Sequence, residues 1–217
     1  MNDQSFDKEA LKQFLENRFD PSIEKTEEQK IIESIMDLTS KHQKDSIGSL
    51  LLDAAMMISK QFEFKEISIG LKDKSDGLFK YAVALGCMPA IQEAHKKIAY
   101  TLNDMKDSTK YPNIVIGRIS ELIIDSPEEE LKTFNRPALI HKKRNTIDEF
   151  LEGDYIDLFM YGGGDEMIGW VEIAAPKDGK IPDKIKMLRL ELTVTIISRI
   201  LWERVYARES MKPMIIS

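Results

Sequence analysis

Apolar residues recur at helical spacing near both ends of the chain and alternate with polar residues in its middle. The clearest helical stripe, with steps of three and four residues, consists of Ile47, Leu50, Leu51, Ala54, Met57 and Ile58. A second long helix is predicted from Ile185 to Val205. Between these two helices, period-two alternation predicts several strands. The pattern therefore predicts helices that flank a sheet.

Residues 1–45 contain almost no Gly or Pro and are predicted to form a helical extension. A first helix is expected from Asp7 to Arg18, ending before Pro21. Thr26 and Gln29 form a capping box that opens a second helix. A polar run at residues 40–46 separates its apolar positions from those of the next helix. Because the sheet would already be covered by that next helix, we expect the segment before Ser46 to mediate dimerisation.

The first predicted hairpin lies between residues 65 and 86. Ile67, Ile69 and Leu71 alternate with polar residues or Gly, and residues 73–77 end in a glycine suited to a turn. The returning strand covers residues 78–86. Its alternation places four side chains on one face, namely Phe79, Tyr81, Val83 and Leu85.

The middle of the chain is predicted to contain shorter elements. Pro89 opens a helix that we expect to continue to about Leu102. A strand follows at residues 113–119, and residues 120–125 either continue it or begin a helix. Capping signals then predict short helices at residues 126–134 and 146–153, with a strand at residues 138–141 between them.

A second hairpin is predicted from residue 155 to residue 173, with Gly162–Gly164 in its turn. No helix follows these glycines directly, so they indicate turn geometry and not a phosphate-binding loop. In the first strand Tyr155, Phe159 and Tyr161 alternate with Ile156, Leu158 and Met160. A mixed aromatic and polar face of this kind suits either a small-molecule pocket or ordinary packing against a loop.

The composition excludes several classes of function. The chain has 217 residues and a formal net charge of −6, so it lacks the positive field expected of a nucleic-acid-binding protein. Cys87 is the only cysteine, which excludes an internal disulfide and a cysteine-based zinc cluster. The N-terminus has no apolar signal region, and no apolar run is long enough to span a membrane. We expect a soluble, cytoplasmic protein without a membrane partner.

Several motifs resemble those of GAF domains, a family of small-molecule sensors. The hairpin from Ile67 to Leu85, the segment Asn135-Arg136-Pro137-Ala138-Leu139-Ile140, the paired strands from Leu158 to Ile173, and the helix from Ile185 to Val205 are similar to family elements in this order. The resemblance covers residues 46–208, leaving 1–45 as the extension and 209–217 as a tail. The PAS fold, which also has an antiparallel sheet, is the alternative.

The resemblance implies an α+β fold with a central antiparallel sheet of five to six strands. Long N- and C-terminal helices would cover one face, and short helices and loops the other. GAF domains bind cyclic nucleotides, bilins, haem, amino acids or other metabolites, and some only dimerise. The cyclic-nucleotide pattern has no counterpart in this sequence, Cys87 does not match the bilin attachment site, and one cysteine is too few for methionine sulfoxide reduction. The chain is therefore expected to be non-catalytic.

A ligand is expected between the sheet and the segment from Cys87 to His141. His95, on the edge of an apolar helix face, could ligate haem, with Met88 nearby, although a partly buried histidine with a hydrogen bond, or one that points to water, is the favoured interpretation. His141 precedes a basic run that could hold an anion, although a solvated loop is favoured. Arg118 could project into a cavity, although an outward strand position paired with a carboxylate is favoured. The predicted ligand-binding residues are Tyr81, Cys87, Met88, Ile91, His95, Ile116, Arg118, His141 and Tyr161. No metal site is expected, and the cofactor is unknown.

Three functions are consistent with these observations. The first is a homodimeric sensor that binds an unidentified small molecule and signals through its helices or a separate protein partner. The second is a ligand-free dimerisation or interaction scaffold. The third is a haem-based sensor that uses His95.

Overall fold

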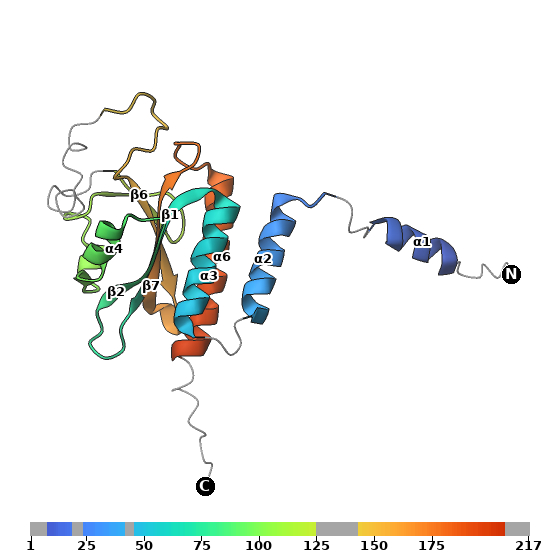
Figure 1. Cartoon of the computed structure of the whole chain (residues 1–217), viewed down its shortest axis with the longest axis horizontal. Coiled ribbons are helices and arrows are strands. Elements are labelled where there is room, and N and C mark those ends of the chain that lie inside the picture. Colours follow the sequence, from blue (N-terminus) through green and yellow to red (C-terminus); the bar gives the residue numbers. More distant parts are fainter. Residues whose placement is uncertain (1–7, 19–23, 42–45, 125–142, 207–217) are drawn as a thin grey trace, which may run out of the picture.

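The computed structural model describes residues 8–18, 24–41, 46–124 and 143–206. Its described strands form one sheet of seven strands, and helices lie against both faces of this sheet (Figure 1). The predicted α+β class is confirmed. The predicted count of five to six strands is too low, because two short strands were not recognised as separate elements.

All neighbouring strands run antiparallel, in the order β3-β2-β1-β7-β6-β5-β4. The central strands are the longest, and the strands shorten towards both edges. Their bounds are β1 Phe64–Lys72, β2 Phe79–Leu85, β3 Ala99–Tyr100, β4 Asn113–Val115, β5 Ser120–Ile123, β6 Tyr155–Tyr161 and β7 Met167–Pro176.

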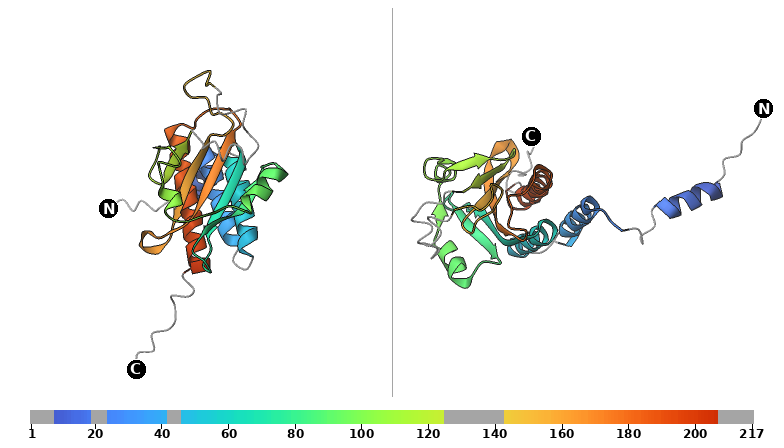
Figure 2. Two further views of the ribbon diagram at one scale, coloured as in Figure 1. Left: turned by 90° about the vertical axis from the view of Figure 1, so that its left-hand side faces the viewer. Right: turned by 90° about the horizontal axis from the view of Figure 1, so that it is seen from above.

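Long helices cover one face of the sheet: α3 (Ile47–Phe62) and α6 (Lys184–Leu201), with α2 (Glu27–Lys41) packed outside them (Figures 1 and 2). The main hydrophobic core lies between these helices and the sheet. Its fully buried side chains come from alternate strand positions and from the helix stripes, and they include Leu50, Leu51, Ile58, Ile67, Ile69, Ile156, Leu158, Met160, Leu190, Val194 and Ile197. The predicted packing of the C-terminal helix beside the helix at residue 47 is confirmed.

The starts of these helices follow their capping residues. Thr26 Oγ1 accepts a hydrogen bond from the amide of Gln29, and Gln29 Oε1 accepts one from the amide of Thr26, as a capping box requires. Ser46 caps α3 and Asp183 caps α6 through their side-chain oxygens. The predicted starts at Glu27 and Ile47 are thus confirmed.

A β-bulge in the first hairpin separates the residues of β2 into two groups. Ile69 pairs with Val83 while Gly70 pairs with Tyr81, so Ala82 is the extra residue. Val83 therefore packs against the main core, whereas Tyr81 lies on the opposite face of the sheet. The prediction that Phe79, Tyr81, Val83 and Leu85 share one face is wrong, because alternation does not continue across a bulge.

The second face of the sheet carries short elements. Helix α4 (Pro89–His95) ends seven residues before the predicted Leu102, and β3 follows it and pairs with β2. Residues 120–123 neither continue β4 nor begin a helix, because they turn back as β5. Residues 146–153 form turns and isolated bridges instead of the predicted helix.

At the N-terminal end, α1 (Lys8–Arg18) confirms the first predicted helix and has no buried residue. The predicted helix at residues 126–134, the strand at 138–141 and the tail at 209–217 lie outside the described residues. In the described parts of the chain, no helix is both long enough and apolar enough to cross a membrane.

Candidate functional site

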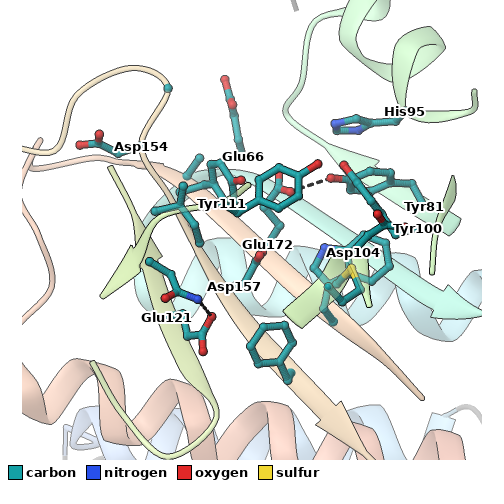
Figure 3. Close-up of a pocket in the computed structure, with 18 of the residues that line it drawn as sticks. Glu66, Tyr81, His95, Tyr100, Asp104, Tyr111, Glu121, Asp154, Asp157 and Glu172 are labelled. Carbon is teal, nitrogen blue, oxygen red and sulfur yellow. Dashed lines mark hydrogen bonds between the residues drawn. The ribbon is translucent and has the colours of Figure 1, made fainter. Parts of the chain in front are cut away.

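A cavity of about 90 Å³ lies on the second face of the sheet, between the strands and the segment from Cys87 to Asn113 (Figure 3). Its walls combine aromatic rings with carboxylates. The aromatic and apolar side chains come from both hairpins and from the short elements, and they include Tyr81, Cys87, Ile91, His95, Tyr100, Met105, Tyr111, Ile123, Tyr155, Phe159 and Trp170. The carboxylates are Glu66, Asp104, Asp107, Glu121, Asp154, Asp157 and Glu172.

Trp170 of β7 forms the base of the aromatic wall. Its indole lies across Gly70 of β1 so closely that a Cβ at that position would come within 2.0 Å of the ring. Tyr81 and Tyr100 meet Trp170 edge to face, with ring centroids 4.9 and 5.9 Å apart. Trp170 and Phe79 belong to a second, smaller hydrophobic core, against which Tyr81 and Tyr100 pack. This second core forms a wall of the cavity that is separate from the main core.

His95 is part of the same aromatic wall. It is buried at the end of α4, and its imidazole stacks on Tyr81 with centroids 3.9 Å apart and planes 8° apart. The structure therefore supports the interpretation of His95 as a buried structural histidine. Its stacking also fixes the phenol ring of Tyr81 beside the cavity.

Hydrogen bonds from neutral groups fix two of the carboxylates. The Tyr81 hydroxyl donates to Glu172 Oε2 at 2.7 Å (Figure 3). Burial, together with the negative charge of Glu172, raises the pKa of Tyr81 well above its usual value. The side-chain amide of Asn113 donates to Glu121 Oε2, and burial raises the pKa of Glu121.

Other carboxylates at the cavity have structural roles. Asp154 forms a two-point ion pair with Arg144, with distances of 2.7 and 2.9 Å. Asp104 accepts hydrogen bonds from the amide and hydroxyl of Thr101, and Asp107 accepts equivalent bonds from Thr109. These interactions fix the turns around the rim of the cavity.

Four of the predicted ligand-binding residues line this cavity together: Tyr81, Cys87, Ile91 and His95. Arg118 and Tyr161 line an adjacent hollow, which shares Asn113, Glu121 and Phe159 with the cavity. Both hollows lie on the face of the sheet where a ligand was expected. Whether these residues contact a ligand remains a prediction.

Three predicted residues are not among the lining residues. Met88 precedes α4 with 56% of its surface exposed. Ile116 packs against the main core, on the helix side of the sheet. His141 lies outside the described residues. Whether these residues contact a ligand also remains a prediction.

Apart from Tyr161, the predicted site omitted the residues of the second hairpin, although that hairpin forms much of the cavity floor. Asp157, Phe159, Trp170 and Glu172 all line the cavity. A signal for them is present in the sequence, since Asp157 lies between Ile156 and Leu158, and Glu172 between Val171 and Ile173. A carboxylate between buried apolar strand residues indicates that the second face of the sheet is polar.

The cavity does not fit haem. Pockets for drug-sized ligands measure roughly 300–1,000 Å³, several times the volume found here. The ring of His95 is stacked against Tyr81, and Met88 is exposed. Among the described residues, no group of three or more His, Cys, Asp or Glu is arranged to hold a metal ion. The site suits a small organic ligand.

A buried carboxylate connects the edge of this face to the long helices. Glu191 of α6 is 7% exposed and accepts hydrogen bonds from the Ile119 amide at 2.9 Å and the Ser120 hydroxyl at 2.8 Å. Gly117 makes room for it, because a Cβ there would approach Glu191 Oε1 to 2.1 Å. The turn between β4 and β5, which borders the adjacent hollow, is thereby attached to α6.

Comparison with known proteins identifies the fold. No protein-family model matches the sequence, and no curated protein matches it. Solved structures of GAF domains do match, with sequence identities of 8–12% in the three described next.

One is the GAF domain of a protein described as a sensor histidine kinase from Pseudomonas syringae pv. tomato (TM-score 0.52, 8% identity, 93% of this chain and 97% of that chain). Another is the GAF domain/HD domain protein from Geobacter sulfurreducens (TM-score 0.53, 12% identity, 75% and 97%). A third is a far-red absorbing dark state with bound biliverdin IXα (TM-score 0.52, 10% identity, 82% and 100%). The chain has the GAF-domain fold.

Proposed function

We propose that this chain is a non-catalytic, cytoplasmic sensory module that binds a small molecule in the cavity on the second face of its sheet. The observation that carries the proposal is the cavity itself, in which aromatic rings and carboxylates from both hairpins converge. Convergent polar groups in a concave aromatic site are typical of small-molecule pockets. The solved GAF domain with bound biliverdin is consistent with ligand binding by this fold, although the present cavity suits a much smaller ligand.

The output would be a homodimer formed through the long helices. On α6, Ile185, Leu188 and Leu192 follow helical spacing and remain 61–63% exposed. Exposed apolar side chains also occur on α2 and α3, at Ile32, Met36, Leu52 and Met56. Apolar surface of this kind favours association with a second apolar surface. A separate signalling protein would receive the output.

The link between cavity and helices would be the turn between β4 and β5. The hairpin that β4 and β5 form lines the cavity with Asn113 and Glu121. In its turn, Ile119 and Ser120 donate hydrogen bonds to Glu191 of α6. A ligand that binds more tightly to one position of this hairpin would shift the packing of α6 through Glu191.

A ligand-free scaffold is the second candidate, and the exposed apolar helix faces favour it equally well. The two functions differ in whether the cavity is occupied in the cell. Native mass spectrometry of the full chain, purified from its own cells, reports both occupancy and oligomeric state.

A dimer carrying one small molecule per chain is the expected result. The matched control is the double variant Leu188→Glu and Leu192→Glu, which should give a monomer that still carries the ligand, since both residues lie on the helix side of the sheet. A dimer whose cavity is empty would support the scaffold and contradict the sensor. A monomeric wild-type chain would contradict the helical output.

A further inference from the structure

Two cations from distant parts of the chain line the hollow beside the cavity. Lys106 ends a short helical turn, and Arg118 lies in the turn between β4 and β5. The hollow has a volume of about 230 Å³, which suits a small ligand. In the described parts of the chain, neither cation forms an ion pair. Both are therefore available to an anionic group of a ligand.

Hydrogen bonds fix the two turns that carry these cations. In the first turn, Asp104 accepts hydrogen bonds from the amide and the hydroxyl of Thr101 at 2.8 and 2.6 Å. In the second, Ile119 and Ser120 donate to Glu191 of α6. The backbone of both cations is thus held in place beside the hollow.

Tyr161 of β6 adds a neutral donor to the same hollow. Burial raises the pKa of Tyr161 above its ordinary value of 10.0, so its hydroxyl keeps its proton at neutral pH. A hydroxyl that keeps its proton can donate a hydrogen bond to an anion. Three potential donors for an anion therefore come from three separate elements.

One carboxylate lines the hollow as well. Glu121 of β5 is the single acid among the described residues around the hollow, and it also lines the cavity. Its hydrogen bond from Asn113 comes from a neutral amide, and burial raises its pKa (Figure 3). An ammonium group beside Glu121 would favour its charged form and form a charge-assisted hydrogen bond with it.

The opposite charges are separated along the hairpin. Strand residues advance about 3.3 Å each, so the backbone of Glu121 lies up to about 10 Å from that of Arg118. Most of the other side chains around the hollow are apolar, namely Met105, Val115, Ile119, Phe159 and Met167. Methylene groups pack well against such side chains. The hollow thus combines a positive region, an apolar surface and a negative region.

We propose that this hollow binds a linear ω-amino carboxylate. Its carboxylate would contact Lys106 and Arg118, its methylene groups would pack on Phe159, and its ammonium group would contact Glu121. An α-amino acid separates its two charges too little to span the hollow. A diamine would place a cation beside Arg118, and a dicarboxylate would place an anion beside Glu121. This inference rests on the proposed ligand-binding function and specifies the ligand's class.

Calorimetric titration of the full chain at pH 7 tests the inference, with 4-aminobutanoate and 5-aminopentanoate as probes. An ionic strength of about 0.15 M screens diffuse surface attraction. Saturable binding of one molecule per chain is expected for at least one probe. Pentanoate, which lacks the ammonium group, and 1-aminopentane, which lacks the carboxylate, should each bind at least about tenfold more weakly.

Single substitutions assign the contacts. Arg118→Gln and Lys106→Gln should each weaken binding of the probe several-fold, because each removes a charge-assisted hydrogen bond to the carboxylate. Glu121→Gln should remove most of the advantage of 5-aminopentanoate over pentanoate, because the ammonium group loses its charged partner. The matched control Lys60→Gln removes an exposed cation of α3, on the helix side of the sheet, and should leave the affinity unchanged.

The companion probes define the contrary results. Equal binding of pentanoate or of 1-aminopentane would overturn the recognition of two opposite charges. Equal binding of L-norvaline, the isomer of 5-aminopentanoate whose charges are adjacent, would overturn the separation of the two contacts. Failure of both probes to bind would overturn the inference, while a metabolite of another class found by native mass spectrometry would leave the proposed sensor function standing.

Discussion

The two faces of the central sheet are made by the same strands but differ in what their side chains do. In β6, Ile156, Leu158 and Met160 are fully buried beneath α3 and α6, while Asp157 and Phe159 point into the cavity. The helix face is apolar and closely packed. The cavity face carries carboxylates in register on neighbouring strands, namely Glu121, Asp157 and Glu172. The helix face therefore supplies the main hydrophobic core, whereas the other face supplies polar groups to the cavity.

The elements on the two faces differ in the same way. On the helix face, α3 and α6 contain 16 and 18 residues and begin with side-chain caps. On the cavity face, α4 has 7 residues and no side-chain cap, and β3 has 2 residues. Short elements with few buried contacts open at lower free energy than core elements. The cavity face is thus the side on which a ligand can change the structure.

The largest expected effect distinguishes adjacent residues of β6. Leu158→Ala should lower the free energy of unfolding by about 2–5 kcal/mol, because it leaves a cavity in the main core. Asp157→Asn, one position away, is the control and should change stability much less, because it keeps the size of a side chain that lies outside the main core. Urea denaturation of both variants measures the difference. A greater loss in Asp157→Asn would reverse the assigned roles of the two faces.

The second largest effect on stability is expected at Glu191, which connects the two faces of the sheet. Glu191→Ala should cost about 1–3 kcal/mol, because the buried amide of Ile119 and hydroxyl of Ser120 would lose their acceptor. Hydrogen exchange should show faster opening of the turn between β4 and β5. The control Glu203→Ala removes an exposed acid of the same helical segment. Equal stability of the two variants would show that Glu191 does not hold the turn to α6.

A smaller effect concerns Tyr206, in the helical turn Trp202–Tyr206 that follows α6. The Tyr206 hydroxyl donates to the carbonyl of Lys72 at 2.8 Å, and burial raises the pKa of Tyr206 to about 12. Tyr206→Phe should therefore cost about 1 kcal/mol, the contribution of one hydrogen bond. Thermal unfolding at neutral pH measures this loss. No change would mean that packing alone attaches this turn to β1.

The smallest expected effect is a pH dependence of stability that arises from Glu121. Burial raises the folded-state pKa of Glu121 above its ordinary 4.5, so the folded protein holds this proton to higher pH than the unfolded chain does. At pH values above its raised pKa, the charged Glu121 lowers the free energy of unfolding by the full amount of this penalty. The penalty decreases as the pH falls and disappears towards pH 4.5. Glu121→Gln should be slightly more stable than wild type at pH 7 and equal to it near pH 4. A difference that does not change with pH would contradict this origin.

Much of the fold follows from the sequence because its signals are local. The capping box at Thr26 and the apolar stripe from Ile47 to Ile58 define α2 and α3, and the alternation in residues 155–161 correctly separates the core residues of β6 from the mixed face. The polar run between α2 and α3 correctly separates those two helices. Each of these signals depends on residues within a few positions of one another.

The site could be predicted only in part, because it depends on register. The bulge at Ala82 places Tyr81 opposite Gly70 and leaves Val83 in the core, and nothing in the alternation of β2 marks that change. Glu121, Asp157 and Glu172 lie side by side only because β5, β6 and β7 are aligned in this register. The three residues are far apart in sequence, so their alignment across the sheet could not be predicted from local patterns.

Native mass spectrometry of the wild type and of Asp157→Asn, each purified from the protein's own cells, tests the central claim most directly. The wild type should carry one small molecule per chain. The variant should carry less of it, because Asp157 lies in the wall of the cavity. Equal occupancy in both proteins, or an empty cavity in the wild type, would contradict the assignment of the cavity face to ligand binding.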